Sequence, residues 1–506
     1  MKKRLLQVLS IVTLALISLG VNAQTRYVDE VFQNYNKVSD IEYDSNRTIN
    51  LQYQPGVNSP IITAKLRCDI YTPTGDTIAK RPVIILAHTG SYLPAIINQQ
   101  PTGNKNDSSI VEMATKFAKR GYVVFAINYR LGWNPQTTVQ VDAAQQLIKA
   151  TYRAIQDVRN AIRFARTNAT AYGIDTSKII VGGQGTGGYV ALGVAAVDKV
   201  QDIITNPKFQ IGFDPMINID TLGDWNGLGG LPFFNYGGET TVSGNAHMVF
   251  NIGGAMGDSA WMDNNTLPIV GLQCPSDPYA PYRTGNVVVP GSNITVIPSA
   301  SGAGVVVPFA NSLGINSTIN ARAYNDAISV RGLAVTSNTN NLYPFITGFP
   351  YESAPWEWWD RPTVQSIDFP SAGAGRRADS LSMLTNPMMS ATRGKAYCDT
   401  IVRFVAPRIA AQFSLSVGVK EVVNYANSVL LFPNPAKDVL TVSMDRNNAR
   451  INEINIFDVT GKLVNTTTAL NSFEQTIHID YLNKGIYLVN IKLDNGASAT
   501  KRLVIE

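Results

Sequence analysis

Three histidines occur in the 506 residues of this chain, and they limit the catalytic mechanisms open to it. Hydrolysis by a nucleophilic side chain commonly requires a histidine that takes the nucleophile's proton, a carboxylate that orients the histidine, and backbone N–H groups that stabilise an oxyanion. Any histidine in such a mechanism must be His88, His247 or His478. His247 starts an expected strand, at the end opposite the active-site edge, so a packing or surface role is favoured for it. His478 lies in a C-terminal region of different composition.

A glycine-rich turn, Gly-Gln-Gly-Thr-Gly-Gly at 183–188, follows a short apolar run and precedes a run of small residues. This order is typical of the G-x-S-x-G turn that carries a nucleophile between a strand and a helix, where glycines avoid contacts that a Cβ would make. Aligned on its glycines, the turn has Gly185 at the nucleophile position, and glycine has no oxygen to attack with. Thr186 would replace it only if the alignment moved by one residue, and the side chain of Gln184 would then clash.

The elements that must position this turn alternate between apolar runs and helical patterns. An antiparallel strand pair is expected within 27–70, and the final helix is expected at 392–412, kinked or ended by Pro407. Buried strands are expected at 81–88, 121–128, 178–182, 248–252 and 268–273, with helices at 111–120, 151–172 and 189–198. Strands that alternate with helices predict an α/β fold with a doubly wound, mostly parallel sheet. Two irregular insertions, at about 201–245 and 279–390, are expected to form lids or binding loops.

Both ends of the chain differ from this body, which is expected to cover 24–415. Residues 1–23 have a basic start, an apolar run and a small-x-small cleavage site, which predict a signal peptide. After an expected linker at 416–429, residues 430–506 contain short alternating strands and turn residues, which predict a small all-β sandwich.

The composition excludes several classes of function. The formal net charge is +5, partly from the basic start of the chain, so the sequence has no basis for a nucleic-acid-binding surface. Three cysteines and no CxxC spacing argue against a disulfide framework and against zinc, and no metal or cofactor is expected. Apart from the leader, no segment approaches the roughly 20 apolar residues of a spanning helix, so the mature form is expected to have none.

Residues 430–506 resemble the type A C-terminal sorting domain of the type IX secretion system. The matching segments are Phe432-Pro-Asn-Pro435, Ile456-Phe-Asp-Val-Thr-Gly461, Leu482-Asn-Lys-Gly-Ile-Tyr-Leu488 and Lys501-Arg-Leu-Val-Ile505. The resemblance implies export across the outer membrane by the type IX machinery, followed by release or attachment to the cell surface.

The body resembles an α/β-hydrolase of the carboxylesterase and lipase group. The matching segments include Asp69-Ile-Tyr-Thr-Pro73, Asn128-Tyr-Arg-Leu-Gly132, Tyr172-Gly-Ile-Asp175 and the turn at 183–188. The resemblance implies that Asp277 stands at the position of the catalytic acid. In this family the catalytic histidine follows the acid and precedes the last helix, but this sequence has no histidine between Asp277 and Gln412. Asp277 is therefore favoured as a vestigial acid that bonds its own turn.

The resemblance also implies an oxyanion wall. The segment His88-Thr-Gly90 departs from the family's H-G-G pattern at Thr89, and a structural role is implied for His88. The residues expected around the ligand pocket are His88, Thr89, Gly90, Gln184 and Thr186. With N–H groups but no nucleophile, such a pocket is expected to bind a carboxylate or an ester.

Three functions stay open from the sequence. The first is a non-catalytic protein that binds an unidentified small molecule or glycan. The second is an active carboxylic-ester hydrolase with a rearranged catalytic group. The third is a surface adhesin, which would need a filled pocket and exposed side chains in the aromatic cluster within 343–359. For that cluster, a role in packing the second insertion is favoured over a sugar-binding platform.

Overall fold

The computed structural model describes residues 25–95, 97–98, 100–238, 241–289, 294–366, 379–415, 429–444, 450–494 and 498–506. The chain divides into two compact units, 1–417 and 418–506. The predicted signal peptide at 1–23 and residues 416–428 of the predicted linker lie outside the described residues.

An eight-stranded sheet in the order β1-β2-β4-β3-β5-β8-β10-β13 forms the centre of the first unit. Its strands are β1 (Tyr35–Ile49), β2 (Ile61–Pro73), β3 (Arg81–Ala87), β4 (Val123–Ile127), β5 (Ile174–Gln184), β8 (Met248–Ile252), β10 (Ile269–Gln273) and β13 (Leu342–Pro344). The pairs β1–β2 and β2–β4 are antiparallel, and every pair from β4 to β13 is parallel. The predicted doubly wound α/β fold is confirmed.

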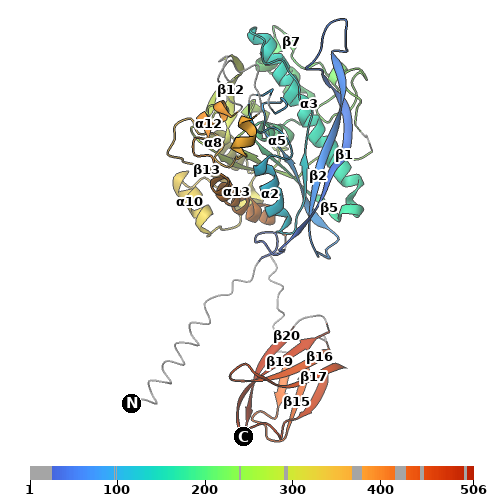
Figure 1. The fold of residues 1–506 in the computed structure, drawn as a ribbon, viewed down its shortest axis with the longest axis vertical. Coiled ribbons are helices and arrows are strands. Elements are labelled where there is room, and N and C mark those ends of the chain that lie inside the picture. The colour runs from blue at the N-terminus through green and yellow to red at the C-terminus, as the bar shows by residue number, and fades with distance from the viewer. Residues whose placement is uncertain are drawn as a thin grey trace. The chain divides into compact units, whose positions relative to one another are not determined.

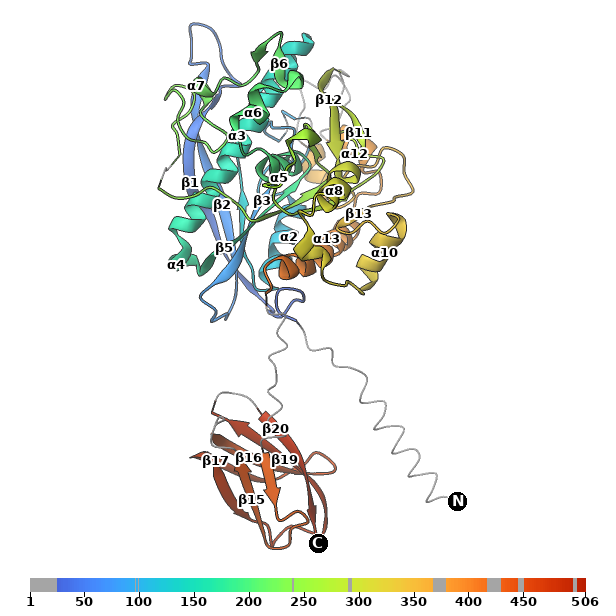
Figure 2. The same cartoon turned by 180° about the vertical axis from the view of Figure 1, so that it is seen from behind.

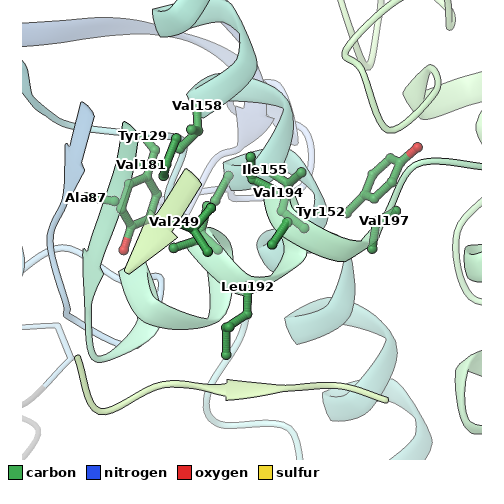
Figure 3. Close-up of a cluster of buried hydrophobic side chains, with 14 of the residues drawn as sticks. Ala87, Tyr129, Tyr152, Ile155, Val158, Val181, Leu192, Val194, Val197 and Val249 are labelled. Atoms are coloured by element: carbon green, nitrogen blue, oxygen red, sulfur yellow. The ribbon is translucent and has the colours of Figure 1, made fainter. Parts of the chain in front are cut away.

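Helices cover both faces of this sheet (Figures 1 and 2). Successive residues of a strand point to opposite faces, so Ile85 of β3 packs in one core and Ile84 in the other. The helices α3 (Gln140–Thr167) and α5 (Thr186–Ala196) cover the first core, and α2 (Ser108–Ala118) and α13 (Ala391–Gln412) cover the second. Figure 3 shows part of the first core, where Val181 and Val249 of the sheet lie near Leu192 of α5.

Two element predictions are wrong in their extent, and one is confirmed. Helix α3 begins at Gln140 rather than near Thr151, because Ala143, Leu147 and their neighbours extend its buried face by three turns. The final helix has its predicted extent, as α13. It does not end at Pro407, because the packing of its buried side chains outweighs the lost backbone hydrogen bond. The segment 279–390 is not only an insertion, because it supplies β13, whose three residues are too few to show a strand pattern.

The insertions form regular elements of their own. The first contains α6 (Val200–Ile204), η1 (Pro207–Phe209), β6 (Gln210–Ile211), β7 (Asp214–Pro215) and α7 (Ile219–Leu222), and after β8 come β9 (Ala255–Met256) and η2 (Ser259–Trp261). The second contains β11 (Thr284–Val288), β12 (Thr295–Gly302), α8 (Ala303–Ser312), α9 (Ser317–Asn320), α10 (Ala327–Val335), α11 (Arg361–Gln365) and α12 (Ser380–Thr385). A short helix, α4 (Ala169–Tyr172), follows α3. Strands β11, β12 and β9 form a small second sheet.

The second unit consists of two antiparallel sheets, β14-β15-β18 and β17-β16-β19-β20. Its strands are β14 (Val429–Phe432), β15 (Val439–Met444), β16 (Ile451–Asp458), β17 (Leu463–Ser472), β18 (Glu474–His478), β19 (Gly485–Leu493) and β20 (Ser498–Ile505). Apolar residues from both sheets, such as Leu440 and Ile454, share one core. The all-β prediction is confirmed.

Candidate active site

A cavity of about 1000 Å³, called here the elbow cavity, lies at the carboxyl ends of the parallel strands. Ligands of open α/β sheets commonly bind at this edge. The strand ends provide Thr89 after β3, Gly185 after β5, Gly253 after β8 and Asp277 after β10. The second insertion closes the cavity with valines of β11 and with residues around Trp356.

The turn after β5 has the strained geometry of a nucleophile elbow. Gly185 has φ 55° and ψ −119°, a conformation that L-residues adopt only at a cost. Its N–H donates to the Ile252 carbonyl at 2.8 Å, and its carbonyl accepts from the Gly188 N–H at 2.9 Å. A Cβ on Gly183 would lie 1.8 Å from the Gly187 carbonyl oxygen, so the chain crosses itself too closely for a side chain there. The backbone shape is therefore built into the sequence.

The space above Gly185 is occupied by its neighbour Thr89. A Cβ on Gly185 would lie 2.1 Å from Thr89 Oγ1 and 2.8 Å from Thr89 Cβ. The threonine that departs from the H-G-G pattern thus fills the place where a nucleophile side chain would begin. Gly185 and Thr89, the two residues that depart from the family patterns, are therefore complementary in space: one lacks a side chain where the other supplies one.

Thr186 faces a tyrosine at the base of the elbow. The Tyr129 hydroxyl donates to the His88 carbonyl at 2.8 Å and lies 3.2 Å from Thr186 Oγ1. Because the single tyrosine proton goes to the carbonyl, the Thr186 hydroxyl donates its own proton to Tyr129. No described histidine or carboxylate is within hydrogen-bond distance of this hydroxyl.

His88 is fully buried and stacks on the Tyr129 ring, with centroids 4.4 Å apart. Burial lowers the pKa of His88 to about 4, so the ring is neutral. His88 and Gly90 are not among the residues that line the elbow cavity, whereas Thr89, Gln184 and Thr186 are. Among the described residues, the N–H groups of Gly90 and Thr186 have no acceptor, and of these two residues only Thr186 lines the cavity.

Asp277 uses its carboxylate within its own turn. Oδ1 accepts the N–H groups of Tyr279 at 2.8 Å and of Ala280 at 3.3 Å, the local pattern expected from the sequence. Burial in the cavity wall nevertheless raises the pKa of Asp277 to about 8, against the lowering effect of these two N–H groups.

The structure brings Trp356 and Glu357 to the cavity from the segment between β13 and α13, for which the sequence favoured packing of the insertion over a binding role. This is where a catalytic histidine would be expected. The point that a Cβ on Gly253 would occupy lies 3.2 Å from the Trp356 ring and 3.7 Å from Asp277 Oδ2. The indole therefore lies on the same side of the cavity as the carboxylate. The only signal in the sequence was the dense aromatic and acidic composition of this segment.

Glu357 is held by polar side chains rather than by a cation. Its carboxylate accepts from Gln184 Nε2 and, at 3.4 Å, from Thr102 Oγ1, while Ser109 Oγ donates to Gln184 Oε1 at 2.8 Å. Burial raises the pKa of Glu357 to about 7. The nearby Asp107 is also buried, and its pKa is raised well above the usual range by burial and by Glu357.

Carboxyl groups line the elbow cavity without a cationic partner among the described lining residues. Within the described part of the chain, no lysine, arginine or histidine side chain lines it, while Asp277 and Glu357 both do. An ionised ligand carboxylate would meet these groups without a counter-charge. The geometry favours an uncharged ligand over the carboxylate ligand that the sequence left open.

Other candidate residues have structural partners. Glu352 is buried and paired with Arg393 at 2.9 Å, so Glu352 and Glu357 do not form a carboxylate pair across one site. In the aromatic cluster, Tyr343, Phe345, Trp356 and Trp359 are buried, and Phe349 and Tyr351 are exposed. Most of the cluster therefore packs the insertion. His247 accepts the Ile179 N–H through Nδ1 at 3.1 Å, next to the start of β8.

The three cysteines are buried and free. In the part of the chain that the structure covers, groups of three or more potential metal ligands are absent. Among those same residues, no helix is both long enough and apolar enough to cross a membrane.

Comparisons with known proteins bear on this geometry. Residues 68–251, which include the elbow and the strands that carry it, match the BD-FAE family. These residues therefore belong to an esterase-like α/β-hydrolase domain. Residues 430–506 match the secretion system C-terminal sorting domain, so this α/β-hydrolase is exported to the cell surface or released. No curated protein sequence matches the chain.

Solved structures similar to the hydrolase body include esterase 2 of Thermogutta terrifontis. Its form phosphorylated by paraoxon shares 19% identity, with 43% of this chain and 69% of that chain covered and a TM-score of 0.28. Its apo form shares 18% identity, with 43% and 70% covered and a TM-score of 0.28.

Proposed function

We propose that this exported α/β-hydrolase is a non-catalytic binding protein, whose ligand occupies the elbow cavity. The observation that supports the proposal most strongly is that position 185 is a glycine and that Thr89 fills the space above it. The nucleophile position is glycine, and the Thr89 hydroxyl lies 2.1 Å from the point where a side chain would start. A serine placed there without other changes would clash, so the site is adapted to its absence.

The segment that would hold a histidine supports the same proposal. It contributes Trp356 and Glu357 to the cavity, and no imidazole is among the described lining residues to shuttle a proton between a nucleophile and a leaving group. An indole N–H only donates, and the Glu357 carboxylate is already bonded to Gln184 and Thr102.

Hydrolysis of p-nitrophenyl acetate and butyrate by the full chain tests the proposal. We expect no turnover above that of the Asp277→Asn variant. The matched gain-of-function variant is Thr89→Gly with Gly185→Ser and Trp356→His, since removal of the threonine clears the serine and the new imidazole lies beside Asp277. We expect the ester turnover of this triple variant to exceed that of the native protein at least about 100-fold. The control is the double variant Gly185→Ser with Trp356→His, which retains Thr89 and is expected to show no gain. Turnover by the native protein that is lost in Asp277→Asn or Glu357→Gln would overturn the proposal.

A second candidate, an ester hydrolase with a rearranged catalytic group, has one observation in its favour. Asp277 and Glu357 line the same cavity, and burial raises the pKa of each toward neutrality, to about 8 and about 7. Two such carboxyls can act as general acid and base on a water molecule. This candidate predicts native turnover that depends on both carboxyls and is indifferent to Thr186→Val.

A further inference from the structure

A second cavity of about 600 Å³ adjoins the elbow cavity. It lies between α3, α5, the first insertion and the loop around η2, and six of its wall residues are Ile155, Val197, Ile203, Phe209, Ile217 and Trp261. Thr151, Tyr189 and Ile297 line both cavities, so the two share a wall. The two cavities are therefore neighbours across these three side chains.

The hydroxyls in the wall of the second cavity are bonded to protein carbonyls. Thr151 donates to Leu147 at 3.0 Å, Tyr152 donates to Gly223 at 2.9 Å, and Tyr189 donates to Tyr279 at 3.0 Å. The indole N–H of Trp261 has no acceptor among the described residues, while its ring stacks on Phe209 with centroids 5.1 Å apart. An ordered water needs two to four polar partners, and this wall does not offer them. Its chemistry suits an aliphatic occupant.

The elbow cavity differs from the second cavity because carboxyl groups line it. Asp277 and Glu357 line it, with no cationic side chain among the described lining residues. Polar groups such as Ser353 and Thr385 also face it. A ligand that fills both cavities would place a polar head near the carboxyls and an apolar chain between α3 and α5.

We infer that the two cavities form one site for a single-chain amphiphile whose head group carries no negative charge. The aliphatic chain passes Thr151, Tyr189 and Ile297 into the second cavity, and the head hydrogen-bonds beside Asp277. A fatty-acid carboxylate is rejected, because its charge would be buried against Asp277 and Glu357 without a counter-ion. This inference rests on the proposed non-catalytic function and names the class of ligand.

Binding of n-alkanols to the full chain tests the inference, because alkanols cannot be hydrolysed. We expect the affinity to rise about fourfold for each methylene between hexanol and dodecanol, as the chain leaves water. Dodecanoate at pH 8 is expected to bind at least about 10-fold more weakly than dodecanol. Equal affinity of the acid and the alcohol would overturn the assignment of the head group.

Two plugged variants, Val197→Phe and Ile217→Phe, place a ring in the second cavity, and Ile211→Phe is the matched exposed control. Both plugs are expected to flatten the chain-length dependence and to lower dodecanol affinity at least about 10-fold, while Ile211→Phe changes neither. Two plugs are used so that a folding defect in one, detected by thermal unfolding, does not remove the test. An unchanged chain-length dependence in a folded plug variant would overturn the inference.

The position of the chain end is read by tryptophan fluorescence. A bromine on the terminal carbon of 12-bromododecan-1-ol quenches a nearby indole, and Trp261 is the indole in the second cavity. We expect quenching on binding, with most of it lost in Trp261→Phe but retained in Trp225→Phe. Quenching that survives Trp261→Phe would overturn the proposed path of the chain. Ester turnover by the native protein would overturn the proposed function without changing any of these results.

Discussion

The turn around Gly185 and the segment around Trp356 line the same cavity, but they differ from an ester-hydrolysing site in opposite ways. At the turn, the backbone has the strained geometry of a nucleophile elbow, and position 185 is a glycine crowded by Thr89. At the segment between β13 and α13, other side chains, Trp356 and Glu357, enter the cavity. The comparison shows that close backbone packing fixes the shape of the elbow turn. The segment between β13 and α13 is not under this backbone constraint, so its side chains can differ in chemistry.

The largest effect is expected from a side chain inside the elbow. Gly183→Ala would bring a Cβ to 1.8 Å from the Gly187 carbonyl oxygen, a backbone atom that cannot move alone. We expect a loss of about 3 kcal/mol or more in the free energy of unfolding, measured with urea. Gly348→Ala is the control, because nothing lies within 4 Å of its Cβ position. Equal stability of the two variants would show that the elbow is not held by close packing.

A smaller loss in the free energy of unfolding is expected when serine replaces Gly185. Gly185→Ser combines a positive φ with the contact to Thr89, so we expect it to lower the free energy of unfolding by about 2–3 kcal/mol. Gly212→Ser has a positive φ of 65° but open space around it, and it isolates the backbone contribution of about 1 kcal/mol. Thr89→Gly is expected to recover part of the loss in Gly185→Ser. If it does not, the two positions are not complementary.

The facing wall is expected to respond to pH. The folded-state pKa of Glu357, about 7, and of Asp277, about 8, lie above their ordinary values, so the folded protein binds these protons more tightly than the unfolded chain. Their contribution to stability is complete at low pH and is lost as the pH rises from about 5 to 8. Each group contributes a slope of up to about 1.4 kcal/mol per pH unit.

Urea unfolding of the full chain between pH 5 and pH 8 measures this slope for the body. Glu357→Gln and Asp277→Asn are each expected to make the free energy of unfolding depend less steeply on pH. At pH 8, Glu357→Gln is expected to be more stable than the native protein. Slopes in both variants that match the native slope would mean that neither carboxyl is held protonated by burial.

The smallest effect is expected at Thr186. Thr186→Val removes a hydroxyl that lies 3.2 Å from the Tyr129 hydroxyl, which is worth about 1 kcal/mol of stability. No change in ester turnover or in dodecanol binding is expected, because the hydroxyl is engaged with Tyr129 at the base of the elbow. If the native protein turns over esters and this variant does not, Thr186 has a catalytic rather than a structural role.

Much of this arrangement could be predicted from local patterns. Buried strands such as 81–88 and 178–182 appear as continuous apolar runs, because parallel strands are covered on both faces. The glycines at 183–188 indicate the elbow, because only glycine tolerates its crossings. The extent of α3 and strand β13 were not predictable, because tertiary packing decides them against weak or contrary local preferences.

The sequence by itself determined the hydrolase fold, the sorting tail, the absence of a nucleophile oxygen at Gly185, and the absence of a histidine between Asp277 and Gln412. These follow from residue type and order along the chain. Only the tertiary structure decided that Thr89 fills the space above Gly185, that Trp356 and Glu357 enter the cavity, and that a second apolar cavity adjoins it. The physical reason is that cavities and contacts join residues far apart in sequence, and no local pattern encodes which side chains meet.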